Sequence, residues 1–261
     1  EEDLGGIIDT TTLITSFTIT NGDSYQGGGV YIEDASPTLT QLIITGNSAE
    51  YEAGGVYLFN SNSQINNCEI NNNQSIGDGG GIYINWSNVL INNCVFSNNI
   101  AALNGGGAQG GGIYFNYSNG NVSSSLFYGN SAAKGGGIYV DGSNPILIGL
   151  TIYGNHVFNE ENGGGIQGQS NSESPEITNC IVWNNGQNEF AGADNFIVTY
   201  SNIQGGWEGE SNIYADPLFC NPDSSDYTLA ENSPCVGTGD NGRNMGAFGV
   251  GCEAIEIPLS V

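Results

Sequence analysis

The sequence predicts an all-β solenoid, in which short strands coil one above another around a narrow apolar core. The first observation is that two short motifs alternate along the chain with a period of roughly 25 residues. The second is that apolar and polar residues alternate within each motif, which is typical of strands. The third is composition: Gly reaches 42 of 261 residues and helix-forming residues are sparse, so a helical domain is not expected.

The first motif is Gly-Gly-aliphatic-Tyr, and it predicts a strand that follows a glycine corner. Glycine suits such a corner because it accepts positive φ and close backbone approach. The first and third residues after the glycines are apolar and are expected to point inward, whereas the Tyr between them points outward. These strands begin at Val30, Val56, Ile82, Ile113 and Ile138, with a degenerate copy at Ile166.

The second motif is a short apolar segment that closes on an Asn. It begins at Phe17, Leu42, Cys68, Cys94, Ser125, Leu150, Cys180 and Ser201, in steps of 25, 26, 26, 31, 25, 30 and 21 residues. It closes at Asn47, Asn73, Asn99, Asn130, Asn155 and Asn185. We place these Asn at a corner, because Asn tolerates left-handed backbone and its amide bonds to equivalents above and below. The steps are too short for a propeller blade, so each turn should give one strand to each of two or three parallel sheets.

These GGGIY turns and INNC strands resemble the right-handed parallel β-helix repeat proteins of the pectin-lyase-like superfamily, particularly secreted bacterial surface proteins. The resemblance covers roughly Leu13 to Gly206, and a DPLF segment beginning at Asp216, with a later Ser233-Pro234-Cys235, resembles their closing segment. It implies a right-handed parallel β-helix of about seven to eight turns in residues 1–206. Residues 207–261 would form an irregular C-terminal cap.

The charge of the chain excludes several functions. Lys+Arg 2 against Asp+Glu 27 cannot neutralise a row of phosphates, so we expect no nucleic acid partner. No apolar run reaches the roughly 20 residues that span a bilayer, so we expect no membrane insertion. Polysaccharide lyases of this fold use Arg or Lys, and only Lys134 and Arg243 are available. The motifs of inverting glycosidases are missing, and His156 is expected at the surface.

Two predicted outward rows of aromatic residues are candidate ligand-binding strips, because exposed rings suit sugars or protein partners. The alternative is that such rows only stabilise the sheet through contacts between neighbouring strands. The first row contains Tyr31, Tyr57, Tyr83, Tyr114 and Tyr139. The second contains Tyr128, Tyr153 and Trp183.

Acidic residues gather in the segments between the Asn corner and the glycines, which we expect to be variable loops. Stacking would place them along one edge, where clustered carboxylates suit Ca²⁺. The alternative is a solvated edge that keeps the protein soluble. The candidate metal ligands are Asp23, Glu50, Glu52, Asp78, Glu160 and Glu161, and Glu189 lies in an equivalent segment.

The cysteines fall into two groups. Cys68, Cys94 and Cys180 share one inward position, where we expect them to pack as small apolar residues, with Cys68 and Cys94 in vertically neighbouring turns. In the tail we expect a Cys220–Cys235 disulfide, which leaves Cys252 without an evident partner. The start at Glu1 without Met suggests a mature or trimmed chain, and the acidic charge, the Asn-Cys repeats and the tail cysteines favour a secreted, extracellular or cell-surface protein.

The expected function is non-enzymatic: a structural or adhesion protein that contacts carbohydrate or assembles head-to-tail into filaments. Only a short stretch, Glu1 to Thr12, is available for the N-terminal end, and an open turn is a template for pairing, so either upstream residues are missing or another copy covers that end. The segment from Ala254 to Leu259 alternates like a strand and offers an edge to a neighbour. The alternative is a carbohydrate-active enzyme, either a polysaccharide lyase or an inverting glycosidase.

Overall fold

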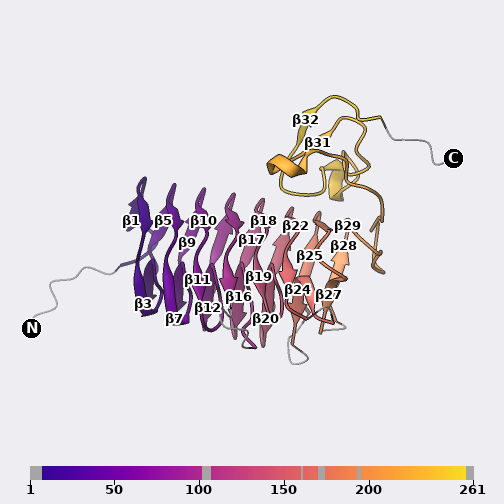
Figure 1. Ribbon diagram of the computed structural model, residues 1–261. Coiled ribbons are helices and arrows are strands. Elements are labelled where there is room, and N and C mark those ends of the chain that lie inside the picture. Colours follow the sequence, from indigo (N-terminus) through magenta and orange to yellow (C-terminus); the bar gives the residue numbers. More distant parts are fainter. Residues whose placement is uncertain (1–7, 102–106, 160, 170–173, 193–194, 257–261) are drawn as a thin grey trace, which may run out of the picture.

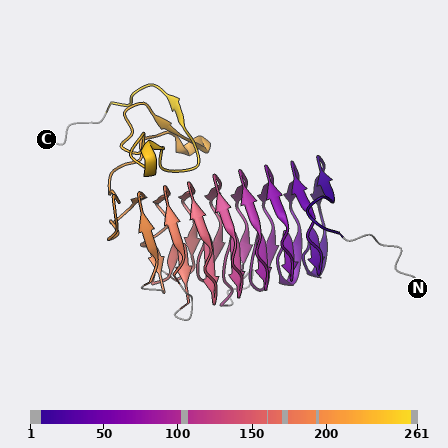
Figure 2. The ribbon, with the colours of Figure 1, turned by 180° about the vertical axis from the view of Figure 1, so that it is seen from behind.

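The protein is a long parallel β-helix with a small β-domain folded back along one side (Figures 1 and 2). The computed structural model describes residues 8–101, 107–159, 161–169, 174–192 and 195–256. Every strand pair of the helix is parallel, and each strand pairs with its equivalents in the turns before and after it. Equivalent side chains therefore stand in vertical files, as the repeat predicts.

The described helix has four sheets, where two or three were expected. Sheet 1 contains β1 (Leu13–Thr15), β5 (Thr38–Thr40), β9 (Gln64–Asn66), β13 (Leu90–Asn92), β17 (Asn121–Ser123), β21 (Ile146–Ile148), β25 (Glu176–Thr178) and β28 (Ile197–Thr199). Sheet 2 contains β2 (Thr18–Thr20), β6 (Ile43–Thr45), β10 (Glu69–Asn71), β14 (Val95–Ser97), β18 (Leu126–Tyr128), β22 (Thr151–Tyr153), β26 (Ile181–Trp183) and β29 (Asn202–Ile203). With eight strands in each and a further half-turn after β29, the helix has slightly more turns than the seven to eight expected.

The other two sheets carry the surfaces of functional interest. Sheet 3 contains β3 (Asp23–Gln26), β7 (Ser48–Glu52), β11 (Gln74–Ser75), β15 (Ile100–Ala101), β19 (Ser131–Ala132) and β23 (His156–Val157). Sheet 4 contains β4 (Val30–Glu33), β8 (Val56–Phe59), β12 (Ile82–Asn85), β16 (Ile113–Asn116), β20 (Ile138–Asp141), β24 (Gly163–Gly168) and β27 (Asn188–Ala191). Sheet 3 is the fourth sheet that the sequence reading missed, because its strands are short and lie where variable loops were expected.

The core consists of inward files that follow the predicted alternation. From Leu39 onward one file is buried, and so is the file of the free thiols from Leu42 onward. Cys68 and Cys94 are vertical neighbours: the backbone N–H of Cys68 donates to Cys94 Sγ at 3.4 Å. Farther along this file, Cys180 Sγ accepts from the backbone N–H of Leu150 at 3.4 Å. All three thiols thus pack in the core, and those of Cys94 and Cys180 each also accept one backbone N–H.

The closing asparagines form a buried ladder, but they are not the left-handed residues. Positive φ belongs to the residue before them, such as Asn72 (54°) and Asn98 (54°). Each ladder Asn donates its backbone N–H and its Nδ2 to the Oδ1 of the next, over 2.8–3.1 Å from Asn47 to Asn185. The physical reason is that the ladder Asn must be buried and regular in conformation to bond to backbone groups of two turns, which an exposed corner residue cannot do.

The two ends of the helix differ. In the first described turn, Leu13 and Phe17 are exposed, and Ile14 and Ile19 are only partly buried. At the other end, the half-turn after β29 covers the core, and Trp207 packs on Phe190 with ring centroids 4.8 Å apart. Residues 207–261, which were expected to form one cap, therefore divide into two parts, and only the first part covers the end of the helix.

The second part is the C-terminal sheet, with β30 (Phe219–Asn221), β31 (Asp226–Ala230) and β32 (Val250–Cys252). Two 3₁₀ helices accompany it, Pro222–Ser224 and Asp240–Gly242. The expected Cys220–Cys235 disulfide is wrong: Cys220 bonds Cys252, with their Cα atoms 5.9 Å apart. Cys235 is instead a buried free thiol that accepts from Asn202 Nδ2 at 3.1 Å, because it faces the helix rather than the other strands. Of the tail segment 254–259, residues 254–256 form no strand and the rest lies outside the described residues.

Candidate functional site

The tyrosine row of sheet 4 is the most regular candidate surface, and most of it is buried. Neighbouring rings contact one another along the sheet, with centroids 5.0–5.5 Å apart from Tyr31 to Tyr139; the first two contacts are stacked and the last two are edge to face. Tyr57, Tyr83, Tyr114 and Tyr139 are only 1–5% exposed, whereas Tyr31 at the N-terminal end is 48% exposed. The row points outward from the sheet as predicted, yet it does not form an exposed strip.

Polar residues on both sides cover these rings. The residues before the glycines form one file: Gln26, Glu52, Asp78, Gln109, Lys134 and Asn162. Residues at the ends of the sheet 4 strands form the other, including Asn116 and Asp141. The phenols bond to the second file: Asn116 Nδ2 donates to Tyr83 Oη at 2.9 Å, and Tyr114 Oη donates to Asp141 Oδ2 at 3.3 Å. Hydrogen bonds to neighbouring side chains thus occupy the hydroxyls that a sugar would use.

Burial also perturbs the carboxyls of this face. It raises the pKa of Asp78 to about 6, and the nearby charges of Glu52 and Asp141 add to the shift. It raises the pKa of Glu52 as well, against the hydrogen bonds from Gln26 and Tyr83. Burial likewise raises the pKa of Tyr83 and Tyr114 well above the usual range. A perturbed carboxyl marks either a catalytic acid or a buried structural group, and the contacts decide between them. Asp78 Oδ1 accepts from the backbone N–H of Gln109 at 2.8 Å, which is a structural contact.

The second aromatic row of Tyr128, Tyr153 and Trp183 is the surface on which the C-terminal sheet packs. Tyr227 lies 5.5 Å from Tyr128 and 5.0 Å from Tyr153, measured between ring centroids. Trp183 lies 5.7 Å from Tyr214. Backbone groups join the same contact, since the N–H of Gly246 donates to Asn179 O at 2.7 Å. This row thus contributes to an intramolecular contact of the protein.

The acidic edge does not come together as a metal site within the residues that the structure describes. No group of three acidic, His or Cys side chains there is arranged to hold an ion. Asp23 accepts from Ser48 Oγ at 2.7 Å, and Glu50 is exposed on the same sheet. Glu52 and Asp78 face the tyrosines instead, and Glu160 lies outside the described residues. Glu161 lies on a separate loop, where its backbone N–H donates to Asn159 Oδ1 at 3.1 Å.

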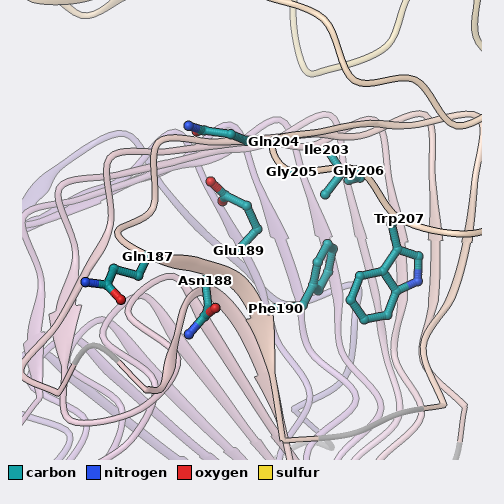
Figure 3. Close-up of a pocket in the computed structure, with 9 residues that line it drawn as sticks. All are labelled: Gln187, Asn188, Glu189, Phe190, Ile203, Gln204, Gly205, Gly206 and Trp207. Atoms are coloured by element: carbon teal, nitrogen blue, oxygen red, sulfur yellow. The ribbon is translucent and has the colours of Figure 1, made fainter.

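Glu189 ends the asparagine ladder and also lines a pocket of about 210 Å³ at the C-terminal end of the helix (Figure 3). Its carboxylate accepts from the backbone N–H of Asn185 at 3.2 Å and from Asn185 Nδ2 at 2.6 Å. Burial raises its pKa to about 6. In Figure 3 the rings of Phe190 and Trp207 lie close together, with the Glu189 carboxylate directed away from them. Its two oxygens replace the missing next Asn, which gives this buried carboxyl a structural role.

Two exposed aromatic pairs were missed by the sequence reading. Trp86 stacks on Tyr117 with centroids 5.1 Å apart and planes 13° apart, and Tyr25 stacks on Tyr51 at 5.5 Å. Trp86 is 61% exposed and Tyr117 48%. A signal was present for the first pair: Asp34, Asn60 and Gly142 occupy the equivalent positions of other repeats. A bulky aromatic residue is unexpected at a position that otherwise takes Asp, Asn or Gly.

The enzymatic alternatives gain little from the placement of the basic residues. Lys134 lies in the polar file beside the tyrosines and forms an isolated parallel bridge with Gln109. Arg243 lies far away in the C-terminal region, at the end of the second 3₁₀ helix. His156 is exposed on β23. Arg243 is therefore in a different part of the molecule from Lys134 and His156, which lie in neighbouring turns.

The fold and these outward surfaces define a parallel β-solenoid with a long repetitive flank. The sequence matches the right-handed β-helix region family over residues 6–155 and 78–209, and the chain belongs to this family. No curated protein matches the chain significantly. Across the described residues, no helix has the length and apolar character needed to cross a membrane.

Proposed function

We propose that the protein is a non-enzymatic, secreted or cell-surface scaffold whose rigid flank serves adhesion. The observation that carries the proposal is the buried tyrosine row on the outer face of sheet 4. Four ring side chains are buried there, and two of the nearby carboxyls are bonded to backbone or amide groups of the chain. Such a face suits mechanical stability better than turnover of a bound polymer.

Two further features support an extracellular setting. The Cys220–Cys235 expectation was wrong about the partner, but a disulfide between Cys220 and Cys252 belongs to an oxidising compartment. The net charge of -25 keeps an exposed protein soluble and repels acidic polymers. An adhesive function would therefore favour neutral ligands over polyuronates.

A screen against neutral and acidic polysaccharides tests this function. Retention on a polysaccharide column without release of reducing ends or unsaturated products is the expected result. Release of new reducing ends by the pure protein, abolished by Asp78→Asn, would instead establish the glycosidase alternative. That alternative has one observation in its favour, the carboxyl of Asp78 with its pKa raised to about 6 and two acidic neighbours.

The proposal includes self-assembly through the N-terminal end of the helix. The first described turn presents exposed apolar side chains, which favours a partner there. The Trp207 half-turn covers the opposite end, so a continuous head-to-tail stack would have to displace it. Light scattering across a hundredfold range of concentration tests this: a mass that rises with concentration supports assembly, and a constant monomer mass contradicts it.

A further inference from the structure

We infer that Trp86 and Tyr117 form a stacking platform for an uncharged sugar ring at the corner between sheets 4 and 1. The inference deepens the proposed function by naming one contact surface and its ligand class. It depends on that function only in expecting binding without turnover. The platform is separate from both aromatic rows described above, because it lies at the corner and not on a sheet face.

The backbone at the platform is strained for these residue types. Trp86 has φ 50° and Tyr117 has φ 45°, in the left-handed region. Asp34, Asn60 and Gly142 share this conformation in neighbouring turns, and Asp, Asn and Gly are the residues that tolerate it. Strained residues persist mainly where function retains them. Folding alone gives no reason for two large rings in successive turns of this corner.

The packing leaves Trp86 available to a ligand. The ring of Tyr117 lies over Gly142, where an added Cβ would be 2.7 Å from the ring carbons Cδ1 and Cε1. Tyr117 is thus supported on one side by glycine and stacked on the other by Trp86. The preceding residue of the file, Asn60, turns its amide away to donate to Asp34 at 2.5 Å. Trp86 is therefore a supported ring that keeps 61% of its surface exposed.

Polar groups beside the rings match a sugar rather than an apolar peptide. Two residues after each aromatic residue comes an exposed Asn, namely Asn88 and Asn119, and Asn62 continues their file. The Oδ1 atoms of Asn62 and Asn119 accept from backbone N–H groups of the next turns, at 3.2 and 2.6 Å. Both side chains are exposed, and an amide whose Oδ1 is engaged still has its Nδ2 to donate, which is the kind of group that the hydroxyl edge of a pyranose requires beside a ring.

The charge of the protein selects the ligand further. With Asp+Glu 27 against Lys+Arg 2, anionic glycans are repelled from every face. A cationic peptide is the competing ligand, since a guanidinium also stacks on Trp. The amide rim favours the sugar, because Asn88 and Asn119 are uncharged and no carboxylate shares their positions in these two turns. We therefore commit to a neutral glycan.

The test uses the full chain and four neutral hexasaccharides, cellohexaose, xylohexaose, mannohexaose and laminarihexaose. Polygalacturonate and an Arg-rich peptide serve as charged comparisons. Isothermal titration calorimetry and tryptophan fluorescence report binding. We expect at least one neutral hexasaccharide to bind, with affinity about tenfold or more weaker for Trp86→Ala and several-fold weaker for Tyr117→Ala. Tyr51→Ala is the matched control, because it removes an exposed stacked ring that lacks the left-handed backbone, and it should bind normally.

A second variant separates binding from folding. Trp86→Asn places at this position the residue that Asn60 already supplies in the preceding turn. It should unfold at the same or a higher temperature than the parent protein and yet fail to bind. The inference is overturned if no neutral hexasaccharide binds, if Trp86→Asn binds like the parent, or if only the Arg-rich peptide binds through Trp86. Cleavage of a bound hexasaccharide would contradict the non-enzymatic function while leaving the platform intact.

Discussion

Two aromatic pairs in the same two turns of the helix show how one repeat can produce opposite environments. Tyr83 and Tyr114 meet edge to face with centroids 5.0 Å apart and are buried under hydrogen-bonded polar residues. Three positions along each turn, Trp86 and Tyr117 stack face to face and are exposed. The first pair lies in unstrained strands, and the second lies in left-handed backbone that costs stability. The difference teaches that aromatic repetition alone marks stability, whereas an aromatic residue that violates its repeat marks a contact surface.

The largest expected effect comes from removing a buried ring. Tyr114→Ala should lower the free energy of unfolding by about 3–5 kcal/mol, because it opens a cavity in the row and leaves Asp141 without its phenol. Denaturant unfolding measures the change, with Tyr114→Phe as the control that keeps the ring. Trp86→Ala should change stability by less than about 1 kcal/mol, since its ring is exposed. Equal losses of unfolding free energy for Tyr114→Ala and Trp86→Ala would contradict the contrast between the buried and the exposed pair.

The next effect concerns the second aromatic row of Tyr128, Tyr153 and Trp183, which the C-terminal sheet covers. Replacing Cys220 and Cys252 by Ser should destabilise that sheet by about 2–4 kcal/mol, because the disulfide closes a loop with a sequence separation of 32. Loosening should expose Trp183 and shift its fluorescence to longer wavelength. Cys235→Ser is the control, and peptide mapping should still find the Cys220–Cys252 bond in it. An unpaired Cys220 thiol in that variant would contradict the structure.

The third prediction tests the buried face through pH. Because burial raises the pKa of Asp78 to about 6, the folded state binds its proton more tightly than the unfolded state does. Stability should therefore fall as pH rises from the ordinary value near 4 through 6, and Asp78→Asn should stabilise the protein at pH 7 by about 1–3 kcal/mol. Thermal melts at pH 5 and 7 measure this, with exposed Glu50→Gln as the control for net charge. A variant with the pH dependence of the parent would show that Asp78 is not the group responsible.

The smallest expected effect tests the exposed pair of Trp86 and Tyr117. Trp86→Asn relieves left-handed strain but loses the stack on Tyr117, so we expect a net gain of about 0.5–1 kcal/mol. Calorimetric melts can resolve a change of this size. Asn60→Trp is the reciprocal control, because it introduces the same strain one turn earlier and should destabilise the protein. A loss of stability in Trp86→Asn would mean that the ring supports the fold.

Much of the fold could be predicted because a solenoid repeats the same residue pattern in every turn. The inward files, the stacked Cys68 and Cys94, and the parallel pairing all follow from a strict alternation that must hold in every turn. The right-handed β-helix family was likewise evident from the glycine and asparagine motifs. Sheet 3 was missed because strands such as β11 have only two residues, too few for periodicity to distinguish them from loops.

The candidate sites were harder to predict, because the direction in which a side chain points from its sheet does not determine how exposed it is. Alternation correctly directed Tyr83 outward from its sheet, but a flanking polar file that belongs to other strands buries it. The acidic residues of the expected calcium edge are not brought together for a similar reason, since Glu52 and Asp78 face the tyrosines and Asp23 does not. Trp86 was missed because the left-handed conformation of its position, which Asp34, Asn60 and Gly142 share, is visible only in the structure.

By itself the sequence determined the solenoid, its vertical files and its strongly acidic surface, since these depend on local periodicity and on composition. The tertiary structure alone decided the partner of Cys220, the burial of the tyrosine row and the position of the C-terminal sheet over Tyr128 and Tyr153. The physical reason is the range of the interactions. Contacts between adjacent turns recur at a fixed spacing and can be read from the repeat, whereas the fold-back of a non-repetitive segment depends on surfaces that form only after the turns have stacked.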